Sequence, residues 1–166
     1  MNVQQASDAE VGTQLRRAFS AFPTGVVAVG AVGADGAPIG MAVNSFTSIS
    51  LDPPLVAISV ANTSRTWPQF ENAASIGLSV LGHAQESVSR QLSAREGDRF
   101  AGIDWQADDD GAVHFPGAAL WLSCTVHSLL PGGDHTIVLL EVSEVDYFAD
   151  VEPLVFHHSR YRTIGE

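Results

Sequence analysis

Short apolar segments separated by turns rich in glycine, proline and aspartate run along most of this chain, and their alternation constrains the fold more than any other feature. Strand-like segments joined by such turns pair with their neighbours as antiparallel hairpins. Two hairpins are predicted, 25–32 with 38–43 around the turn 33–36, and 118–129 with 135–145 around the turn 131–134. Further short strands are predicted at 46–50, 55–60, 75–81 and 154–156, the last closing the sheet.

Helical signals are fewer. Ser7 and Glu10 have the spacing of a capping box, and the apolar residues that follow share one helical face until Pro23 and Gly25 end the helix. Residues 96–116 are polar and rich in glycine and aspartate, which predicts an excursion over the surface. The remaining predicted helices are a short one within 62–72, carrying Trp67 and Phe70, and one over 84–94, with Val88 and Leu92 facing inward.

The fold class that follows is mainly β with a few helices, an antiparallel barrel in a single domain over 1–166. Residues 1–22 form its N-terminal helical part and 23–166 the barrel. No Gly-x-Gly-x-x-Gly fingerprint follows a predicted strand, so a Rossmann dinucleotide site is not the default interpretation.

The net charge of the chain limits the kinds of partner that it can bind. Nineteen acidic residues against eight basic ones give a net charge of −11, which disfavours nucleic acid and anionic membranes. The N-terminus has no signal-peptide pattern and no apolar run is long enough to span a bilayer, so a soluble cytoplasmic protein is expected. Residues 26–81 are nearly free of charge and rich in Ser, Thr and Asn, so an anionic cofactor bound there would meet neutral donors and Arg65.

The most informative stretch runs from residue 40 to residue 55. It places hydrogen-bonding side chains in alternation with apolar ones, which suits a flavin ring that needs donors on one edge and an apolar surface on another. An edge strand with a solvated Ser/Thr face explains the composition equally well. The polar residues concerned are Asn44, Ser45, Thr47, Ser48 and Ser50.

Two further clusters are candidates for ligand contacts. Asn62, Thr63, Ser64 and Arg65 lie between a strand and a helix and form a plausible phosphate cradle, although Asn62 or Ser64 can equally be a helix cap. His135 follows the turn of the second hairpin, where turn chemistry alone does not require an imidazole.

The C-terminal tail is basic and aromatic, with Arg160 suited to a pyrophosphate and Tyr161 to a purine. The alternative is a strand with a solvated edge. His157 and His158 are adjacent and are expected to point to opposite faces of a strand, so no metal site is predicted. The single cysteine, Cys124, lies in an apolar strand and is predicted to pack in the core.

In this order, the segments resemble the short-chain flavin reductases, the reductase components of two-component flavin-dependent monooxygenases. The resemblance covers about 15–164. Its most specific pieces are Ser50-Leu-Asp-Pro-Pro-Leu55 and Gly133-Asp-His135, and it also includes 22–26, Asp98-Arg-Phe100, 122–124 and the tail. It implies a homodimer of FMN-binding split barrels that passes a hydride from NADH or NADPH to FMN or FAD and supplies reduced flavin to a separate monooxygenase.

The resemblance also implies roles for individual residues. Asn44, Ser45, Phe46, Thr47 and Ser48 would line the isoalloxazine, Ser50 and 62–65 would hold the ribityl phosphate, and Phe100 joins this flavin-binding set. His135, His158, Arg160 and Tyr161 would meet the nicotinamide cofactor. The family often has a glycine where this chain has Leu139-Leu140, which leaves open a split barrel that binds flavin or haem without turnover. A purely structural dimer module is a further alternative, but it leaves the charge-free cluster of Ser, Thr and Asn unexplained.

Overall fold

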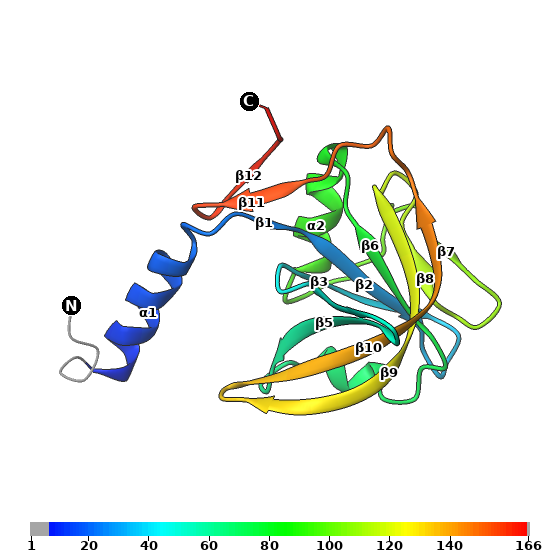
Figure 1. Ribbon diagram of the computed structural model, residues 1–166, viewed down its shortest axis with the longest axis horizontal. Helices are drawn as coiled ribbons and strands as arrows, with labels where there is room; N and C mark the ends of the chain where they lie inside the picture. The colour runs from blue at the N-terminus through cyan, green and yellow to red at the C-terminus, as the bar shows by residue number, and fades with distance from the viewer. Residues whose placement is uncertain (1–6, 166) are drawn as a thin grey trace.

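The computed structural model describes residues 7–165, so residues 1–6 and 166 of the predicted domain lie outside the described part (Figure 1). Twelve strands form three antiparallel sheets in this part, with strand orders β3-β2-β6-β9-β10-β5-β4, β1-β11-β12 and β7-β8. The first sheet consists of β2 (Val27–Val32), β3 (Pro38–Val43), β4 (Thr47–Leu51), β5 (Pro54–Ala61), β6 (Ile76–Val80), β9 (Leu120–Gly132) and β10 (His135–Tyr147). The remaining elements are α1 (Asp8–Phe19), η1 (Trp67–Phe70), η2 (His83–Gln85), α2 (Glu86–Leu92), β1 (Thr24–Gly25), β7 (Gln106–Ala107), β8 (Val113–His114), β11 (Val155–His157) and β12 (Arg160–Arg162).

Both predicted hairpins are present. Strands β2 and β3 pair from Val27 with Val43 to Val32 with Pro38. Strands β9 and β10 are longer than predicted and their turn is shorter, because pairing continues to Gly132 and His135. Two register shifts interrupt the pairing of β9 with β10, where His127 of β9 and Ser143 of β10 are left without an opposite residue. Irregularities of this kind increase strand twist, and Figure 1 shows the hairpin curving out of the body.

The sheet buries apolar side chains on both faces, because neighbouring residues on a strand point to opposite sides. Along β2, Val27 and Val29 enter one cluster with Ile58, Leu78 and the buried side chains of β10. Val26 and Ala28 enter a second cluster, packed with Leu81, Leu92, Val113, Phe115 and Leu154. The first cluster lies in the curve of the sheet, and α2 and β8 cover the second.

The prediction that 96–116 is a surface excursion is wrong at its C-terminal end, where Val113 and Phe115 are fully buried. Strand β8 crosses β2 and β6 so closely that a Cβ on Gly77 would collide with the backbone of Val113. The polar composition of the preceding residues gave no sign that Val113 is buried. Its burial depends on Gly77 of β6, whose missing side chain leaves room for β8.

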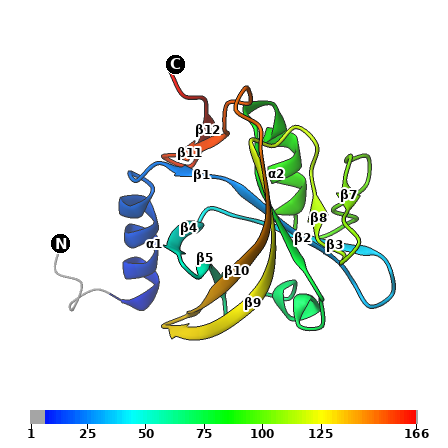
Figure 2. The same cartoon turned by 45° about the vertical axis from the view of Figure 1, so that its right-hand side comes forward.

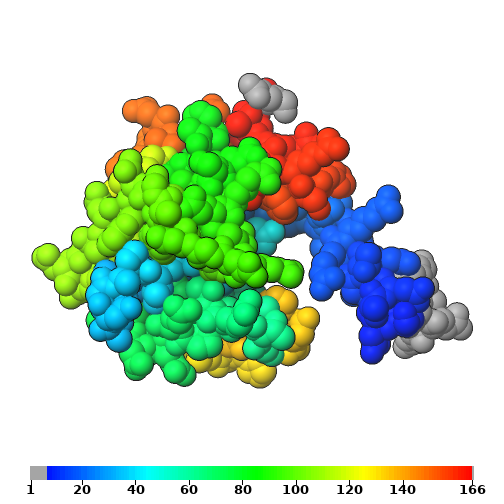
Figure 3. Space-filling model, turned by 180° about the vertical axis from the view of Figure 1, so that it is seen from behind, coloured from blue at the N-terminus to red at the C-terminus, as the bar shows by residue number. Residues whose placement is uncertain are grey.

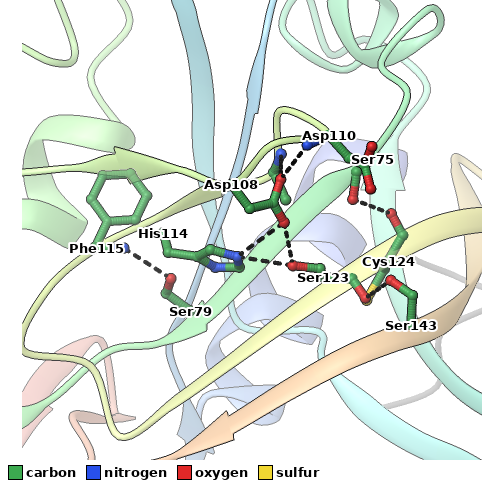
Figure 4. A network of polar contacts seen from close by, with 10 residues as sticks. Ser75, Ser79, Asp108, Asp110, His114, Phe115, Ser123, Cys124 and Ser143 are labelled. Atoms are coloured by element: carbon green, nitrogen blue, oxygen red, sulfur yellow. Dashed lines mark hydrogen bonds and ion pairs between the residues drawn. The ribbon is translucent and has the colours of Figure 1, made fainter.

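A polar network joins β8 to β9 (Figure 4). Ser123 Oγ donates to Asp108 Oδ2 at 2.7 Å and lies 3.1 Å from Nε2 of His114. Because the only hydroxyl proton of Ser123 goes to Asp108, Nε2 of His114 must be the donor of the second bond. The imidazole stacks on Trp121, and its Nδ1 has no hydrogen-bond partner within residues 7–165. Burial lowers the pKa of His114, although the carboxylates of Asp108 and then Asp146 oppose the shift.

Helix α1 begins with the predicted capping box, in which the Glu10 carboxylate accepts from the backbone N–H and the hydroxyl of Ser7. The expected apolar face has no partner within the described chain, since no residue of α1 is buried. Phe19 is 68% exposed, and Phe22, which follows the helix, is 74% exposed. Figures 1 and 2 show α1 standing apart from the sheet, and Figure 3 shows a gap between them.

The prediction that 154–156 closes the main sheet is wrong. Strand β11 pairs instead with β1 and β12 in a separate sheet, where Phe156 lies opposite Thr24 and Tyr161. The backbone N–H of His158 donates to the carbonyl of Ser20, which ties the tail to the end of α1. Of the helices in residues 7–165, none is long and apolar enough to cross a membrane.

Candidate functional site

A groove of about 550 Å³ runs beside β3 and contains an unusual concentration of positive charge. Three arginines line it, Arg65, Arg95 and Arg99, and Asp98 is the only acidic residue among its lining. None of these arginines forms an ion pair with any residue between 7 and 165, although the chain carries a net charge of −11. Guanidinium groups are the donors that phosphates and carboxylates bind in pairs of hydrogen bonds, so this groove is a candidate site for an anion.

The turn after β5 forms one wall of this groove. Ser64 Oγ accepts hydrogen bonds from the backbone N–H groups of Thr66 at 3.3 Å and Trp67 at 3.1 Å. Ser64 therefore accepts from the backbone just before and at the start of η1, whose N-cap position is Thr66 and not the predicted Asn62 or Ser64, and it still has its own hydroxyl proton to donate. Arg65 is exposed beside it, while Thr63 lies in the turn outside the groove lining.

Arg99 forms the opposite wall and is held on three sides. Its Nε donates to the carbonyl of Ala94 at 2.9 Å, and its Nη1 donates to the carbonyl of Gly40 at 2.9 Å and to Thr66 Oγ1 at 3.0 Å. Burial, followed by the nearby charge of Arg65, lowers the pKa of the Arg99 guanidinium. Sequence reasoning missed Arg95 and Arg99, because the only signal was the Asp98-Arg-Phe100 tripeptide.

Phe100 extends this wall over β3. Its ring stacks on Phe115 with centroids 5.9 Å apart and meets the edge of Trp105 at 6.0 Å. A Cβ on Gly40 would lie 2.7 Å from Cζ of Phe100, so the absence of a side chain at Gly40 allows this approach. Phe100 is thus placed at the groove, and its role in flavin binding stays a prediction.

A second hollow of about 230 Å³ lies at the other end of β3. Asn44 lines it together with Ser89, Phe156 and Tyr161. Gly40 borders the groove and Asn44 the hollow, and four residues of extended chain span about 13 Å. Strand β3 therefore connects an apolar hollow with polar edges to an anion-binding groove, an arrangement that suits a ring compound carrying a phosphate.

The polar residues of the 44–50 stretch do not act together within one chain. Ser45 Oγ donates to the carbonyl of Ser59 and accepts from its N–H, so it joins this segment to β5. Phe46 packs against the first core cluster. Thr47, Ser48 and Ser50 lie on β4, the edge strand of the seven-stranded sheet, as the alternative interpretation predicted. Their role in flavin binding stays a prediction.

Asn62 connects the end of β5 to the tip of the long hairpin. Its Nδ2 donates to the carbonyl of Gly133 at 3.2 Å, and its Oδ1 accepts from Thr136 Oγ1 at 2.9 Å. At the same tip, Nδ1 of His135 lies 2.7 Å from Asp134 Oδ1. The hydrogen bond to His135, and then its charge, lower the pKa of the Asp134 carboxyl. Asn62 thus ties the end of β5 to residues on both sides of His135.

Tyr161 is the only one of the predicted tail residues that borders the hollow. Its hydroxyl lies 2.8 Å from Ser89 Oγ, and the Arg90 guanidinium stands 4.8 Å from the centre of its ring. Arg160 is exposed. Figures 1 and 2 show this tail well apart from the hairpin tip that carries His135, so one chain alone does not bring the predicted nicotinamide contacts together.

The expectation that His157 and His158 point to opposite faces is wrong. Strand β11 ends at His157, and His158 has a left-handed backbone with φ of 49°. The turn brings the two rings together, with centroids 4.0 Å apart. Within residues 7–165, no three His, Cys, Asp or Glu side chains are grouped to hold a metal ion.

Cys124 is fully buried in the first core cluster, as predicted. Burial raises the pKa of its thiol to about 12, so the reactive thiolate is not formed near neutral pH.

The chain belongs to the flavin reductase-like domain family, whose model matches residues 19–165. A flavin reductase from Pseudomonas putida is 37% identical over 146 residues, which make up 88% of this chain and 86% of that protein. Two longer relatives from Rhizobium meliloti are matched over 42% and 56% of their length.

Solved structures share the fold. The nitrilotriacetate monooxygenase component B homolog from Mycobacterium thermoresistibile has a TM-score of 0.90 at 35% identity, over 95% of this chain and 89% of that one. The NADH:FAD oxidoreductase SgcE6 of Streptomyces globisporus C-1027, in complex with NAD and FAD fragments, has a TM-score of 0.86 at 38% identity, over 95% of each chain.

Proposed function

We propose that this chain is an NAD(P)H:flavin oxidoreductase that binds FMN or FAD along β3 and brings NADH or NADPH to it. Bound flavin supplies the ring that accepts a hydride from the nicotinamide. The observation that carries the proposal is the groove, in which Arg65, Arg95 and Arg99 have no acidic partner in the described chain and adjoin an uncharged polar segment. Family membership supports the same interpretation.

The protein's own contribution is binding and orientation. Arg65, Arg99 and the hydroxyl of Ser64 hold the flavin phosphate, and Phe100 and Gly40 shape the groove beside it. Of the rest of the flavin-binding set, residues 44–48 line the ring, and Ser50, Asn62 and Thr63 join the phosphate contacts. Fixing the two rings face to face is the main catalytic demand of a hydride transfer, so no acid–base pair is required.

The nicotinamide contacts require a second copy of the chain. His135 lies at the hairpin tip and Tyr161 at the tail, which are well apart in one chain (Figures 1 and 2). In the homodimer that we propose, the tail of one copy approaches the hairpin of the other. The uncovered face of α1 and the side chain of Leu51, which is 95% exposed, support such a dimer because both present apolar surface that a partner would bury.

We further propose that the reduced flavin leaves for a separate monooxygenase. The support is the name of the Mycobacterium thermoresistibile neighbour, a monooxygenase component, together with the fact that both hollows open to solvent. A flavin held at an open edge can dissociate and be carried to another protein.

The test is NADH oxidation at 340 nm by the purified chain with FMN, FAD or no added flavin. We expect NADH to be oxidised only when flavin is added. The flavin that supports the faster oxidation is the preferred cofactor. Arg65→Gln should raise the KM for flavin, whereas Arg162→Gln, which removes an arginine outside the groove, should not. If the chain binds flavin but oxidises neither NADH nor NADPH, it is a flavin-binding protein and not a reductase.

A further inference from the structure

We propose that Ser89 and Tyr161 form a hydroxyl pair that donates one hydrogen bond to the carboxamide oxygen of the nicotinamide. The inference rests on the proposed function, because it assumes that NADH or NADPH meets the flavin in the hollow that Asn44 lines. It goes further by adding Ser89 of α2, which no sequence pattern singled out, and by naming the atom of the substrate that the pair recognises.

The first step is a count of hydroxyl protons. Ser89 Oγ lies 2.8 Å from the hydroxyl of Tyr161, and this bond uses one of the two protons that the pair carries, whichever atom donates. Neither hydroxyl makes a further hydrogen bond to any residue between 7 and 165. One proton of the pair therefore has no acceptor in the protein, although Ser89 is buried. Both residues line the hollow, so a ligand bound there would supply the missing acceptor.

The second step concerns the acceptor that a helix usually offers. A serine or threonine within a helix often donates to the carbonyl four residues earlier. Thr13 of α1 makes this bond, at 3.0 Å to the carbonyl of Ala9. In the described chain Ser89 makes no such bond to the carbonyl of Gln85, and its hydroxyl meets Tyr161 instead. The side chain of Ser89 is thus engaged with the tail rather than with its own helix.

The third step is the way in which α2 holds the tyrosine ring. Figure 2 shows β12, which carries Tyr161, beside α2. The Arg90 guanidinium stands 4.8 Å from the centre of the ring, and the ring of Phe156 packs against it at 5.2 Å between centroids. Arg90 is itself held, because Glu86 Oε1 accepts from its Nε at 2.9 Å and from its Nη2 at 2.7 Å. A donor fixed before the ligand arrives loses little side-chain entropy on binding.

The fourth step assigns the two sides of the hollow. Strand β3 contributes Asn44, whereas α2 and the tail contribute Ser89 and Tyr161. The residues proposed to line the flavin ring belong to the end of β3 and the chain that follows it, so the side formed by α2 and the tail is left for the second ring. The carboxamide oxygen of a nicotinamide accepts hydrogen bonds, and fixing it orients the ring for hydride transfer.

The experiment compares the Kd values for NAD⁺ and for thionicotinamide adenine dinucleotide, in which sulfur replaces the carboxamide oxygen. They are measured by calorimetry on the chain saturated with oxidised FMN, so that no turnover occurs. The wild-type chain should prefer NAD⁺ by roughly 3- to 10-fold, because sulfur is a weak acceptor. Ser89→Ala and Tyr161→Phe should each abolish this preference and leave the Kd for FMN nearly unchanged. The double variant should be no worse than the more affected single variant, because the pair presents one donor.

Two matched controls should keep the wild-type preference. Ser87→Ala removes an exposed serine from the same helix, and Tyr147→Phe removes the hydroxyl of a tyrosine that is 75% exposed on β10. An unchanged preference for NAD⁺ in both Ser89→Ala and Tyr161→Phe would overturn the proposal. A matching loss of FMN affinity in correctly folded variants, as judged by circular dichroism, would also overturn it, because the donor would then serve the flavin.

The wild-type result separates this proposal from the proposed function. If the wild-type chain oxidises NADH but binds NAD⁺ and its sulfur analogue equally, the hydroxyl pair is overturned and the reductase proposal stands. If it neither oxidises NADH nor binds either dinucleotide, both are overturned. If NAD⁺ binds too weakly for calorimetry, the ratio of kcat/KM for NADH and the reduced sulfur analogue decides, and equal ratios in wild type, Ser89→Ala and Tyr161→Phe would refute the pair.

Discussion

Gly40→Ala tests whether Phe100 and Arg99 really shape the flavin groove. The new Cβ would stand 2.7 Å from Cζ of Phe100 and 3.2 Å from Cδ2 of Leu92, which is about 0.7 Å short of ordinary contact at the closer atom. The ring cannot easily retreat, because it stacks on Phe115, which is fully buried, and Leu92 is fully buried as well. Overpacking of this kind costs about 1–3 kcal/mol, and the conformational gain of replacing a strand glycine offsets about 0.5–1 kcal/mol of it.

The variant should therefore lose about 1–2 kcal/mol of unfolding free energy in urea. Its Kd for FMN should rise by roughly tenfold, because moving Phe100 also displaces the neighbouring Arg99 from the Gly40 carbonyl. Gly25→Ala is the control, since a Cβ there meets nothing within 4 Å, and it should stay within about 0.5 kcal/mol of the wild type. A Gly40→Ala chain with an unchanged urea midpoint and unchanged FMN affinity would refute the packing of Phe100 on β3.

Three further outcomes are expected. Gly77→Ala should destabilise the chain by more than about 4 kcal/mol in urea or prevent folding, because its Cβ would meet the buried backbone of Val113; a soluble variant with near-normal stability would contradict this. Because burial lowers the pKa of His114 in the folded state, the unfolded chain binds a proton first as the pH falls through about 6.5, so stability should be lost below that pH. His114→Phe should reduce the loss in urea midpoint between pH 7.5 and 5.5, and an identical loss in both proteins would remove His114 as the cause. His135→Ala should raise the KM for NADH with little change in flavin affinity, and equal losses of both would show that the residue is misplaced.

Local patterns in the sequence were sufficient for most of the secondary structure. Both hairpins, the capping box at Ser7 and the buried position of Cys124 follow from turn chemistry and from the period of apolar residues, which act over a few neighbours. The edge-strand interpretation of β4 also followed from its alternating composition. The polar residues from Asn44 to Ser50, which follow β3 and continue onto β4, were therefore visible before the fold was known.

Other features depend on which distant segments meet. The unexpected depth of Val113 is set by Gly77, a residue on another strand whose missing side chain leaves room for β8. The tail pairs with β1 rather than with the main sheet, and a left-handed residue after β11 brings His157 and His158 together. The depth of Val113 and the pairing of the tail have no local signature, because each depends on contacts between residues far apart in the chain. The turn at His158 is local, but no glycine in it signals a left-handed backbone.

The candidate site shows the same division. By itself, the sequence determined that an acidic chain keeps one charge-poor stretch of hydrogen-bonding residues, and it singled out Arg65. Only the tertiary structure decided that Arg95 and Arg99 share a groove with Arg65 and that Arg99 is held against Gly40. The physical reason is that a strand or a turn is encoded over a few residues, whereas a binding site is formed where the chain returns to itself, at positions that depend on the packing of the whole sheet.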